Sequence, residues 1–168
     1  MSTVSKRAQD RIVLERVFKA TLADVWELWT TAEGIEQWWG PEGFSVKVRK
    51  LDLRPGGELR YAMTADAPQM VAFMKANNMP VTTENVLRFV EVVKPRRLRY
   101  SNLADFIPGV APYEVEHVLE LSETAKGVHL VLTLERMHDE EWTGRMAAGW
   151  EMELGKLEKV LAKRAVAP

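Results

Sequence analysis

The order of apolar and polar residues along the chain predicts one strand, two short helices and then a long run of strands. Residues 11–18 favour a strand because the segment is short and rich in β-branched side chains. A capping box at Thr21 and Asp24 predicts a helix directly after it, and a second box at Thr30 and Glu33 predicts another. The folded part of the chain is therefore expected to begin with a strand and a hairpin of two helices.

From residue 44 onward the apolar residues recur at every second position, which is the spacing of strands. This alternation slips by one position before Leu51 and indicates a β-bulge. The RPGG sequence at 54–57 is typical of a type II turn, so the chain should return as a strand over 58–64. Short polar turns join most of the strands and favour antiparallel pairing. The remaining strands are predicted at 85–93, 98–101, 113–121 and 128–137.

Two further segments have helical spacing. In residues 66–80, Met70, Phe73 and Met74 stand at i, i+3 and i+4, as on an amphipathic helix. Residues 139–165 predict one long helix with an apolar stripe. That stripe consists of Trp142, Met146, Trp150, Leu154, Leu157 and Leu161.

Length and composition fit one globular domain. The chain has 168 residues, of which 46% are hydrophobic and 28% are charged, close to globular averages. We therefore expect a single α+β domain over residues 11–165, with a helical insertion at about 66–80 and a flexible leader at 1–10.

The charge balance argues against partners that require a strong electric field. Lys and Arg number 23 and Asp and Glu number 24, a net charge of -1, so we expect no binding to nucleic acid. No uncharged run is long enough for a membrane span, so we expect no membrane insertion. The absence of cysteine excludes disulfides, thiolate metal sites and cysteine nucleophiles. We expect a cytoplasmic protein, and no residue pattern implies a cofactor.

His117 is the most informative titratable residue. On the predicted strand it shares a face with Tyr113, Val115 and Leu119, so its side chain should point to the apolar, concave side of a sheet. There an imidazole would act as a general base or orient a ligand. The simpler alternative is a core histidine that a neighbour satisfies. No serine, aspartate or second histidine marks a triad, and no histidine pair has ligand spacing, so no metal site is predicted.

Aromatic residues offer further candidate contacts. The tryptophans of the two short helices are interpreted as packing rather than as a cage for a cation: Trp26, Trp29, Trp38 and Trp39. Tyr61 and Tyr100 each bring a hydroxyl group to a strand face, where it needs a partner or a ligand if it points inward. The stripe on the long helix would be core in a solid fold or the wall of a ligand site in a hollow one.

Several motifs occur together in a characteristic order. VFKATLADVWELWTTAEGIEQWWGPEGF is followed by LDLRPGGELRY, then by EVVKPRRLRYS, and a Gly-Trp pair at 149–150 lies in the long helix. Over roughly residues 11–163 this combination resembles the heat-shock protein 90 ATPase activator homologue family, which belongs to the START-like, or SRPBCC, superfamily. The resemblance implies a helix-grip fold, in which a curved antiparallel sheet carries two short N-terminal helices and the long C-terminal helix lies across a cavity.

Two features depart from that family. Residues 66–80 exceed the usual connection, which in the superfamily lies at the cavity mouth together with the loop after the fifth strand. The resemblance thus implies a lid made of Met70, Phe73, Met74, Phe106 and Ile107, although the insertion would equally suit a cap on the sheet or a homodimer interface. Eukaryotic co-chaperones couple this domain to a separate N-terminal domain that this sequence does not show, so chaperone activation is not carried over.

The sequence is compatible with three functions. The first is binding of a small hydrophobic or amphipathic molecule in the cavity. The second is a cyclase, aromatase or hydrolase in which a cavity histidine or tyrosine moves protons, and the third is a co-chaperone-like interaction module. The predicted ligand-binding residues are Tyr61, Met63, Met70, Phe73, Met74, Tyr100, Phe106, Tyr113, His117, Trp142, Met146 and Trp150.

Overall fold

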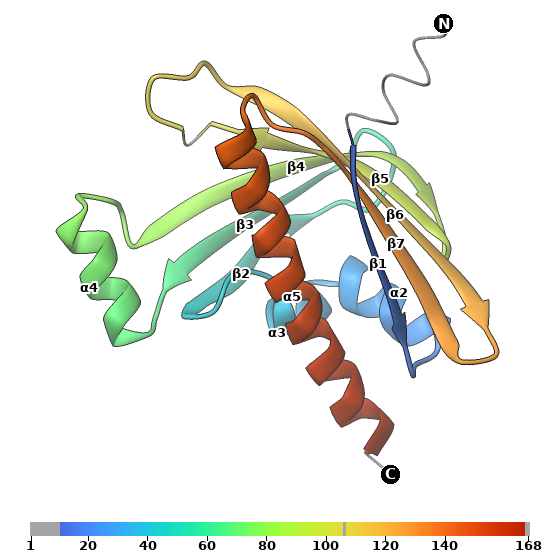
Figure 1. Cartoon of the computed structure of the whole chain (residues 1–168). Helices are drawn as coiled ribbons and strands as arrows, with labels where there is room; N and C mark the ends of the chain where they lie inside the picture. The colour runs from blue at the N-terminus through green and yellow to red at the C-terminus, as the bar shows by residue number, and fades with distance from the viewer. Residues whose placement is uncertain (1–10, 106, 167–168) are drawn as a thin grey trace, which may run out of the picture.

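An antiparallel sheet curves around one long helix in the computed structural model, which describes residues 11–105 and 107–166 (Figure 1). The described part contains seven strands in the order β1-β7-β6-β5-β4-β3-β2, so each strand from β2 to β6 pairs with the next one along the chain, and β1 pairs with β7 instead of with β2. The elements are β1 (Arg11–Phe18), α2 (Leu22–Thr30), α3 (Ala32–Trp38), β2 (Phe44–Leu51), β3 (Glu58–Ala65), α4 (Pro68–Ala76), β4 (Thr82–Val93), β5 (Arg97–Ala104), β6 (Tyr113–Thr124), β7 (Gly127–Glu135) and α5 (Glu140–Val166). The predicted α+β fold is confirmed; the expected leader at 1–10 lies outside the described residues.

The first helix begins where the sequence predicts and the second begins one residue later. Thr21 Oγ1 accepts a hydrogen bond from the Asp24 backbone N–H at the start of α2. The cap of α3 is Thr31 rather than Thr30, because α2 runs through Thr30 and only Thr31 has the extended backbone that a cap needs. Thr31 accepts from the Gly34 N–H, while the Thr30 hydroxyl donates to the Trp26 carbonyl. The second capping box is therefore corrected by one position.

The bulge and the turn between β2 and β3 occur where the sequence predicts them. The β2–β3 register shifts between Val48 and Lys50, which turns the following apolar side chains to the same face as those before. The Gly57 N–H donates to the Arg54 carbonyl, and Gly56 has a φ of +87°, which glycine adopts without strain.

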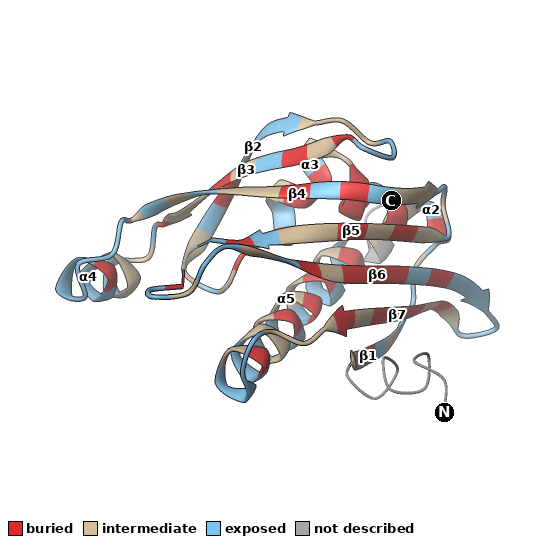
Figure 2. Ribbon diagram, turned by 90° about the horizontal axis from the view of Figure 1, so that it is seen from above, coloured by how far each residue is buried: buried red, intermediate tan, exposed pale blue. Residues whose placement is uncertain are grey.

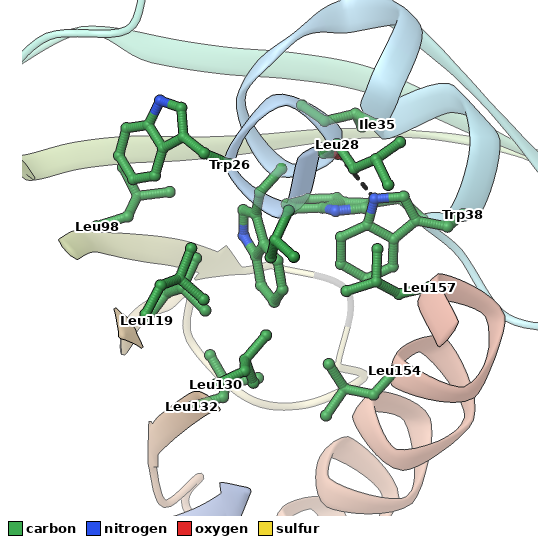
Figure 3. Close-up of a cluster of buried hydrophobic side chains, with 14 of the residues drawn as sticks. Trp26, Leu28, Ile35, Trp38, Leu98, Leu119, Leu130, Leu132, Leu154 and Leu157 are labelled. Atoms are coloured by element: carbon green, nitrogen blue, oxygen red, sulfur yellow. Dashed lines mark hydrogen bonds between the residues drawn. The ribbon is translucent and has the colours of Figure 1, made fainter. Parts of the chain in front are cut away.

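The core lies between the sheet, the two short helices and the second half of α5. Figure 3 shows side chains of α2 and α3 facing leucines of the sheet and of α5. Trp29 stacks on Trp150 with ring centroids 5.7 Å apart, and Trp38 donates its indole N–H to the Leu28 carbonyl at 2.8 Å. Trp26, Trp29 and Trp38 are buried in this core, in line with their interpretation as packing residues.

Buried residues recur along the long helix α5 (Figure 2), and those of its apolar stripe belong to the core formed with the sheet. Asp139 Oδ1 accepts from the Trp142 N–H and so caps the first turn. Leu154, Leu157 and Leu161 are buried in the second half. The first half lies over strands β3 to β6, with which it lines a pocket.

Helix α4 lies at the far end of β3 and β4, away from α5 in both views (Figures 1 and 2). Its Met74 is buried and Phe73 is exposed. Met70 packs against Gly43, where an added Cβ would lie 2.5 Å from the Met70 Cγ. The insertion therefore packs on the end of the sheet.

Candidate functional site

A pocket of about 390 Å³ lies between the sheet and the first half of α5 and is partly open to solvent. Strands β3 to β6 supply its floor, α5 supplies one wall, and the loop between α3 and β2 closes one end. The lining residues are Trp39, Gly40, Pro41, Tyr61, Met63, Asn85, Val86, Asn102, Leu103, Ala104, Val115, His117, Met137, Trp142, Arg145, Met146, Gly149, Trp150 and Glu153. Apolar and aromatic groups dominate, and a few polar groups stand among them, as in many small-molecule sites.

Half of the residues that the sequence predicts for the site line this pocket. They come from β3, β6 and the stripe of α5, and comprise Tyr61, Met63, His117, Trp142, Met146 and Trp150. These residues could be predicted because strand alternation and helical spacing each determine the face of the element on which a side chain lies.

The other predicted residues lie elsewhere. Tyr100 is fully buried behind the pocket wall, with its ring stacked on His117 at 5.2 Å. The Tyr113 hydroxyl is 2.8 Å from His138 Nδ1, near the start of α5. The lid candidates of α4, namely Met70, Phe73 and Met74, are not among the lining residues, because α4 packs at the end of β3. Phe106 lies outside the described residues.

His117 is held at the back of the pocket as a neutral ring. Trp150 Nε1 donates to His117 Nε2 at 3.1 Å, which requires the neutral imidazole to carry its proton on Nδ1. Burial lowers the pKa of His117 from 6.5 to about 4. Since Nε2 is occupied, His117 is poorly placed to take a proton from a ligand. His117 therefore has features of both alternatives that the sequence left open. Trp150 satisfies its ring nitrogen, as expected of a core histidine, and the ring still lines the pocket.

Two tyrosines have strongly raised pKa values: Tyr61 lines the pocket, and Tyr100 lies behind its wall. Burial raises the pKa of Tyr100 well above 10, and the nearby indole N–H of Trp29 opposes this in part. Burial, and then the charge of Glu153, raise the pKa of Tyr61 strongly. In the described chain the Tyr61 hydroxyl has no hydrogen-bond partner, so it is available to a ligand in the pocket.

Glu153 is the polar residue that sequence reasoning missed. Its Oε1 accepts the Gly40 N–H at 2.8 Å, which joins α5 to the loop after α3. Burial raises its pKa to about 7, while the Gly40 hydrogen bond and the charge of Lys156 act in the opposite direction. The signal was present: Glu153 follows Trp150 by three residues and so lies on the apolar stripe of the predicted helix.

The remaining polar lining groups also escaped the sequence analysis. Asn85 of β4 and Asn102 of β5 face the pocket, and the Asn102 Nδ2 is 3.4 Å from each nitrogen of His117. Arg145 lines the opposite end of the α5 wall, where it pairs with Glu141 at 2.8 Å and covers the Trp142 ring. Neither asparagine belongs to a recognisable motif, and only the folded sheet brings them together.

The arrangement suits binding of an apolar body with a polar end. Aromatic and methionine side chains line most of the pocket, and the carboxyl of Glu153 and the hydroxyl of Tyr61 lie at the end closed by the Trp39–Gly40 loop. Over residues 11–105 and 107–166, no three His, Asp or Glu side chains are grouped as metal ligands. No helix in the same ranges is long and apolar enough to cross a bilayer.

Solved structures share this architecture. A protein from Chromobacterium violaceum is 24% identical, with a TM-score of 0.73 over 91% of this chain and 97% of its own. The AHSA1 protein from Silicibacter pomeroyi is 20% identical, with a TM-score of 0.71 over 92% and 99%. An AHSA1-like protein from Aeromonas hydrophila is 17% identical, with a TM-score of 0.70 over 94% and 95%. At these identities the likeness concerns the fold.

The sequence itself matches a family model. No curated protein sequence matches the chain significantly. Residues 19–162, however, match the family described as Activator of Hsp90 ATPase homolog 1-like protein. This range begins in the turn before α2 and ends in the last turns of α5, so it includes the pocket. The resemblance stated from the motifs is thereby confirmed, and the chain belongs to the Activator of Hsp90 ATPase homolog 1-like family, with the helix-grip fold of its structural neighbours.

Proposed function

We propose that this protein binds a small amphipathic molecule in the pocket between the sheet and α5. The observation that carries the proposal is the pocket itself: about 390 Å³, walled by Trp142, Met146 and Trp150, with polar groups at its closed end. Ligand sites in proteins begin at about 300 Å³ and combine apolar walls with few polar groups. The family fold, a sheet gripping a helix, supports the same function.

A pair of glycine variants in α5 tests the proposal. Gly149 lines the pocket and Gly144 does not, and an added Cβ meets no atom within 4 Å at either position. Gly149→Leu should therefore place an isobutyl group at the pocket, whereas Gly144→Leu adds the same group elsewhere on the helix. The probe is 2-naphthalenemethanol, an apolar ring with a hydroxyl group, and the readout is its affinity by titration calorimetry.

The two variants should separate clearly. We expect Gly149→Leu to weaken binding of 2-naphthalenemethanol at least about tenfold, because the leucine displaces roughly 1.4 kcal/mol or more of apolar contact. Gly144→Leu should stay within about twofold of the unmodified protein. Equal affinity of all three proteins would place the binding outside this pocket and overturn the proposal.

A second candidate, proton-transfer catalysis, rests on Glu153 rather than on His117 or Tyr61. A carboxyl with a pKa of about 7 in an apolar pocket is suited to exchange protons near neutral pH. The probe is 5-nitrobenzisoxazole: a carboxylate removes its ring C–H proton, the N–O bond breaks, and a cyanophenolate forms. Turnover that rises with pH through about 7 and disappears in Glu153→Gln would favour this candidate, and no turnover above the free carboxylate rate would exclude it.

A further inference from the structure

Four pocket residues form a small corner at its closed end, here named the carboxylate corner: Trp39, Tyr61, Trp150 and Glu153. The Trp39 ring stands nearly perpendicular to both other rings, at 89° and 5.4 Å from Tyr61 and at 83° and 5.9 Å from Trp150. Glu153 follows Trp150 by about one helical turn on α5. The corner thus combines three electron-rich rings with one carboxyl group.

The carboxyl keeps one oxygen for a ligand. Oε1 of Glu153 accepts the Gly40 N–H at 2.8 Å, and Oε2 has no hydrogen-bond partner in the described chain. Lys156, whose charge acts on Glu153, donates its hydrogen bond to the Gly40 carbonyl at 2.8 Å and is not a lining residue. Arg145 lies eight residues earlier on the helix, about 12 Å along its axis, where it pairs with Glu141. The corner is therefore the acidic end of the pocket.

We propose that the carboxylate corner binds the ammonium group of an organic cation whose apolar ring occupies the rest of the pocket. This inference rests on the proposed binding function and names its ligand class. An ammonium group gains from the faces and π-electrons of aromatic rings and from a partly dehydrated carboxylate at the same time. A neutral hydroxyl gains only a hydrogen bond, and an anion meets repulsion from Glu153.

The corner also predicts how binding depends on pH. With a pKa of about 7, Glu153 is roughly one-tenth ionised at pH 6 and nine-tenths at pH 8, so affinity for a fixed cation should rise about tenfold between them. His117 on β6, with its pKa of about 4, stays neutral over this range. Tyr61 on β3 and Tyr100 on β5 have pKa values raised above 10 and also stay neutral. Among these groups only Glu153 changes its charge between pH 6 and pH 8, so we assign the pH dependence of the affinity to Glu153.

Three probes with one ring system test the inference: 2-naphthylmethyl-trimethylammonium, 2-naphthalenemethanol and 2-naphthoate. Their charges are constant between pH 6 and 8, so any pH dependence comes from the protein. Calorimetry should rank the ammonium at least about tenfold above the alcohol at pH 8, with the carboxylate weakest. At pH 6 the ammonium should bind about tenfold more weakly than at pH 8, while the alcohol stays within about twofold.

Two glutamine variants complete the test. Glu153→Gln should remove the pH dependence and weaken ammonium binding about tenfold at pH 8. A circular dichroism spectrum that matches the unmodified protein would show that this variant is folded. Glu158→Gln, the same change on an exposed position of α5, should behave like the unmodified protein.

The outcomes distinguish this inference from the function on which it rests. Alcohol binding without preference for the ammonium, or ammonium binding that Glu153→Gln leaves unchanged, overturns the cation site and leaves the amphipathic pocket standing. Binding of none of the three probes overturns both.

Discussion

At the scale of single residues, two titratable groups of opposite kind face the same pocket: His117 is buried and Glu153 is partly buried. Burial lowers the pKa of His117 to about 4 and raises that of Glu153 to about 7, because in each case it disfavours the charged form. Both groups are therefore mainly neutral near pH 6. Neither side chain then brings a charge to the pocket, and Glu153 ionises only as the pH rises or a ligand favours its charged form.

These two shifts should act on stability in opposite directions. As pH falls from 6.5 toward 4, the unfolded chain protonates His117 while the native protein does not, so the free energy of unfolding decreases. As pH falls from 7 toward 4.5, the native protein protonates Glu153 while the unfolded chain does not, so the free energy of unfolding increases. Between pH 7 and pH 5 each effect amounts to about 2 kcal/mol, and they nearly cancel.

Single variants should separate the two opposing effects when the free energy of unfolding is measured by urea denaturation at pH 7 and pH 5. When the pH is lowered from 7 to 5, the free energy of unfolding of Glu153→Gln should fall by about 2 kcal/mol relative to the unmodified protein. That of His117→Gln, which keeps an acceptor for Trp150, should rise by about 2 kcal/mol relative to the unmodified protein. Glu158→Gln provides the matched control and should follow the unmodified protein. Parallel pH profiles for all four proteins would contradict the neutral state of both groups near pH 6.

Residue-level patterns in the sequence identified His117, whereas Glu153 was missed although its spacing places it on the apolar stripe of the long helix. Strand alternation is sufficient to place His117 on the concave face. A glutamate within a helical stripe looks like a solvated position, and its burial depends on Gly40, which is 113 positions away in sequence. The cap of α3 was predicted one residue too early for a related reason. Thr30 and Thr31 both have the required hydroxyl, and which of them caps α3 depends on where α2 ends.

At the scale of elements, the glycines of α5 have no packing role that the structure shows. An added Cβ at Gly144 or Gly155 meets no atom within 4 Å. Gly144→Ala and Gly155→Ala should each raise the free energy of unfolding by about 0.5 to 1 kcal/mol, since alanine costs less backbone entropy in a helix. Urea denaturation measures this directly.

Gly34 of α3 is the contrasting helical glycine. A Cβ there would lie 2.5 Å from the Glu27 carbonyl oxygen and 2.6 Å from the Leu28 Cα, so Gly34→Ala must push α3 away from α2. We expect it to destabilise the protein by about 1 to 3 kcal/mol. A stabilised Gly34→Ala, or destabilised alanine variants in α5, would show that the helices pack differently from this account.

Helix α4 is the element whose role the sequence leaves most open. The lid stays a prediction of the family resemblance, whereas in the structure α4 lies away from α5 and its residues do not line the pocket. The β3–β4 pairing reaches Thr64 and Thr82, and the Ala65 N–H donates to the Val81 carbonyl, so an Asn-Gly turn can replace residues 66–80.

This replacement should leave the affinity for 2-naphthalenemethanol within about twofold, because the pocket walls remain. Gly149→Leu in the same assay is the positive control for a lost pocket. A loss of tenfold or more on replacing 66–80, with the sheet still intact by circular dichroism, would instead establish α4 as a cover of the bound ligand.

At the scale of the whole molecule, local signals were sufficient for the order of elements but not for the contents of the pocket. Capping boxes, alternation and the RPGG turn each depend on neighbouring residues, and they predicted the strands and helices with their approximate bounds. The pocket instead joins strands from the middle of the sheet to the first half of α5 and to the Trp39–Gly40 loop. Which tryptophan reaches the pocket and where α4 lies both follow from long-range packing.

The central claim is that the pocket between the sheet and α5 receives the ligand, and the methionine methyl groups report on it most directly. Met63, Met137 and Met146 line the pocket, whereas Met70, Met74 and Met79 belong to the α4 region and do not. Carbon-13 methyl NMR during titration with 2-naphthalenemethanol should therefore shift the first three resonances and leave the other three in place. Unmoved Met63, Met137 and Met146 signals, or shifts confined to Met70, Met74 and Met79, would contradict the account.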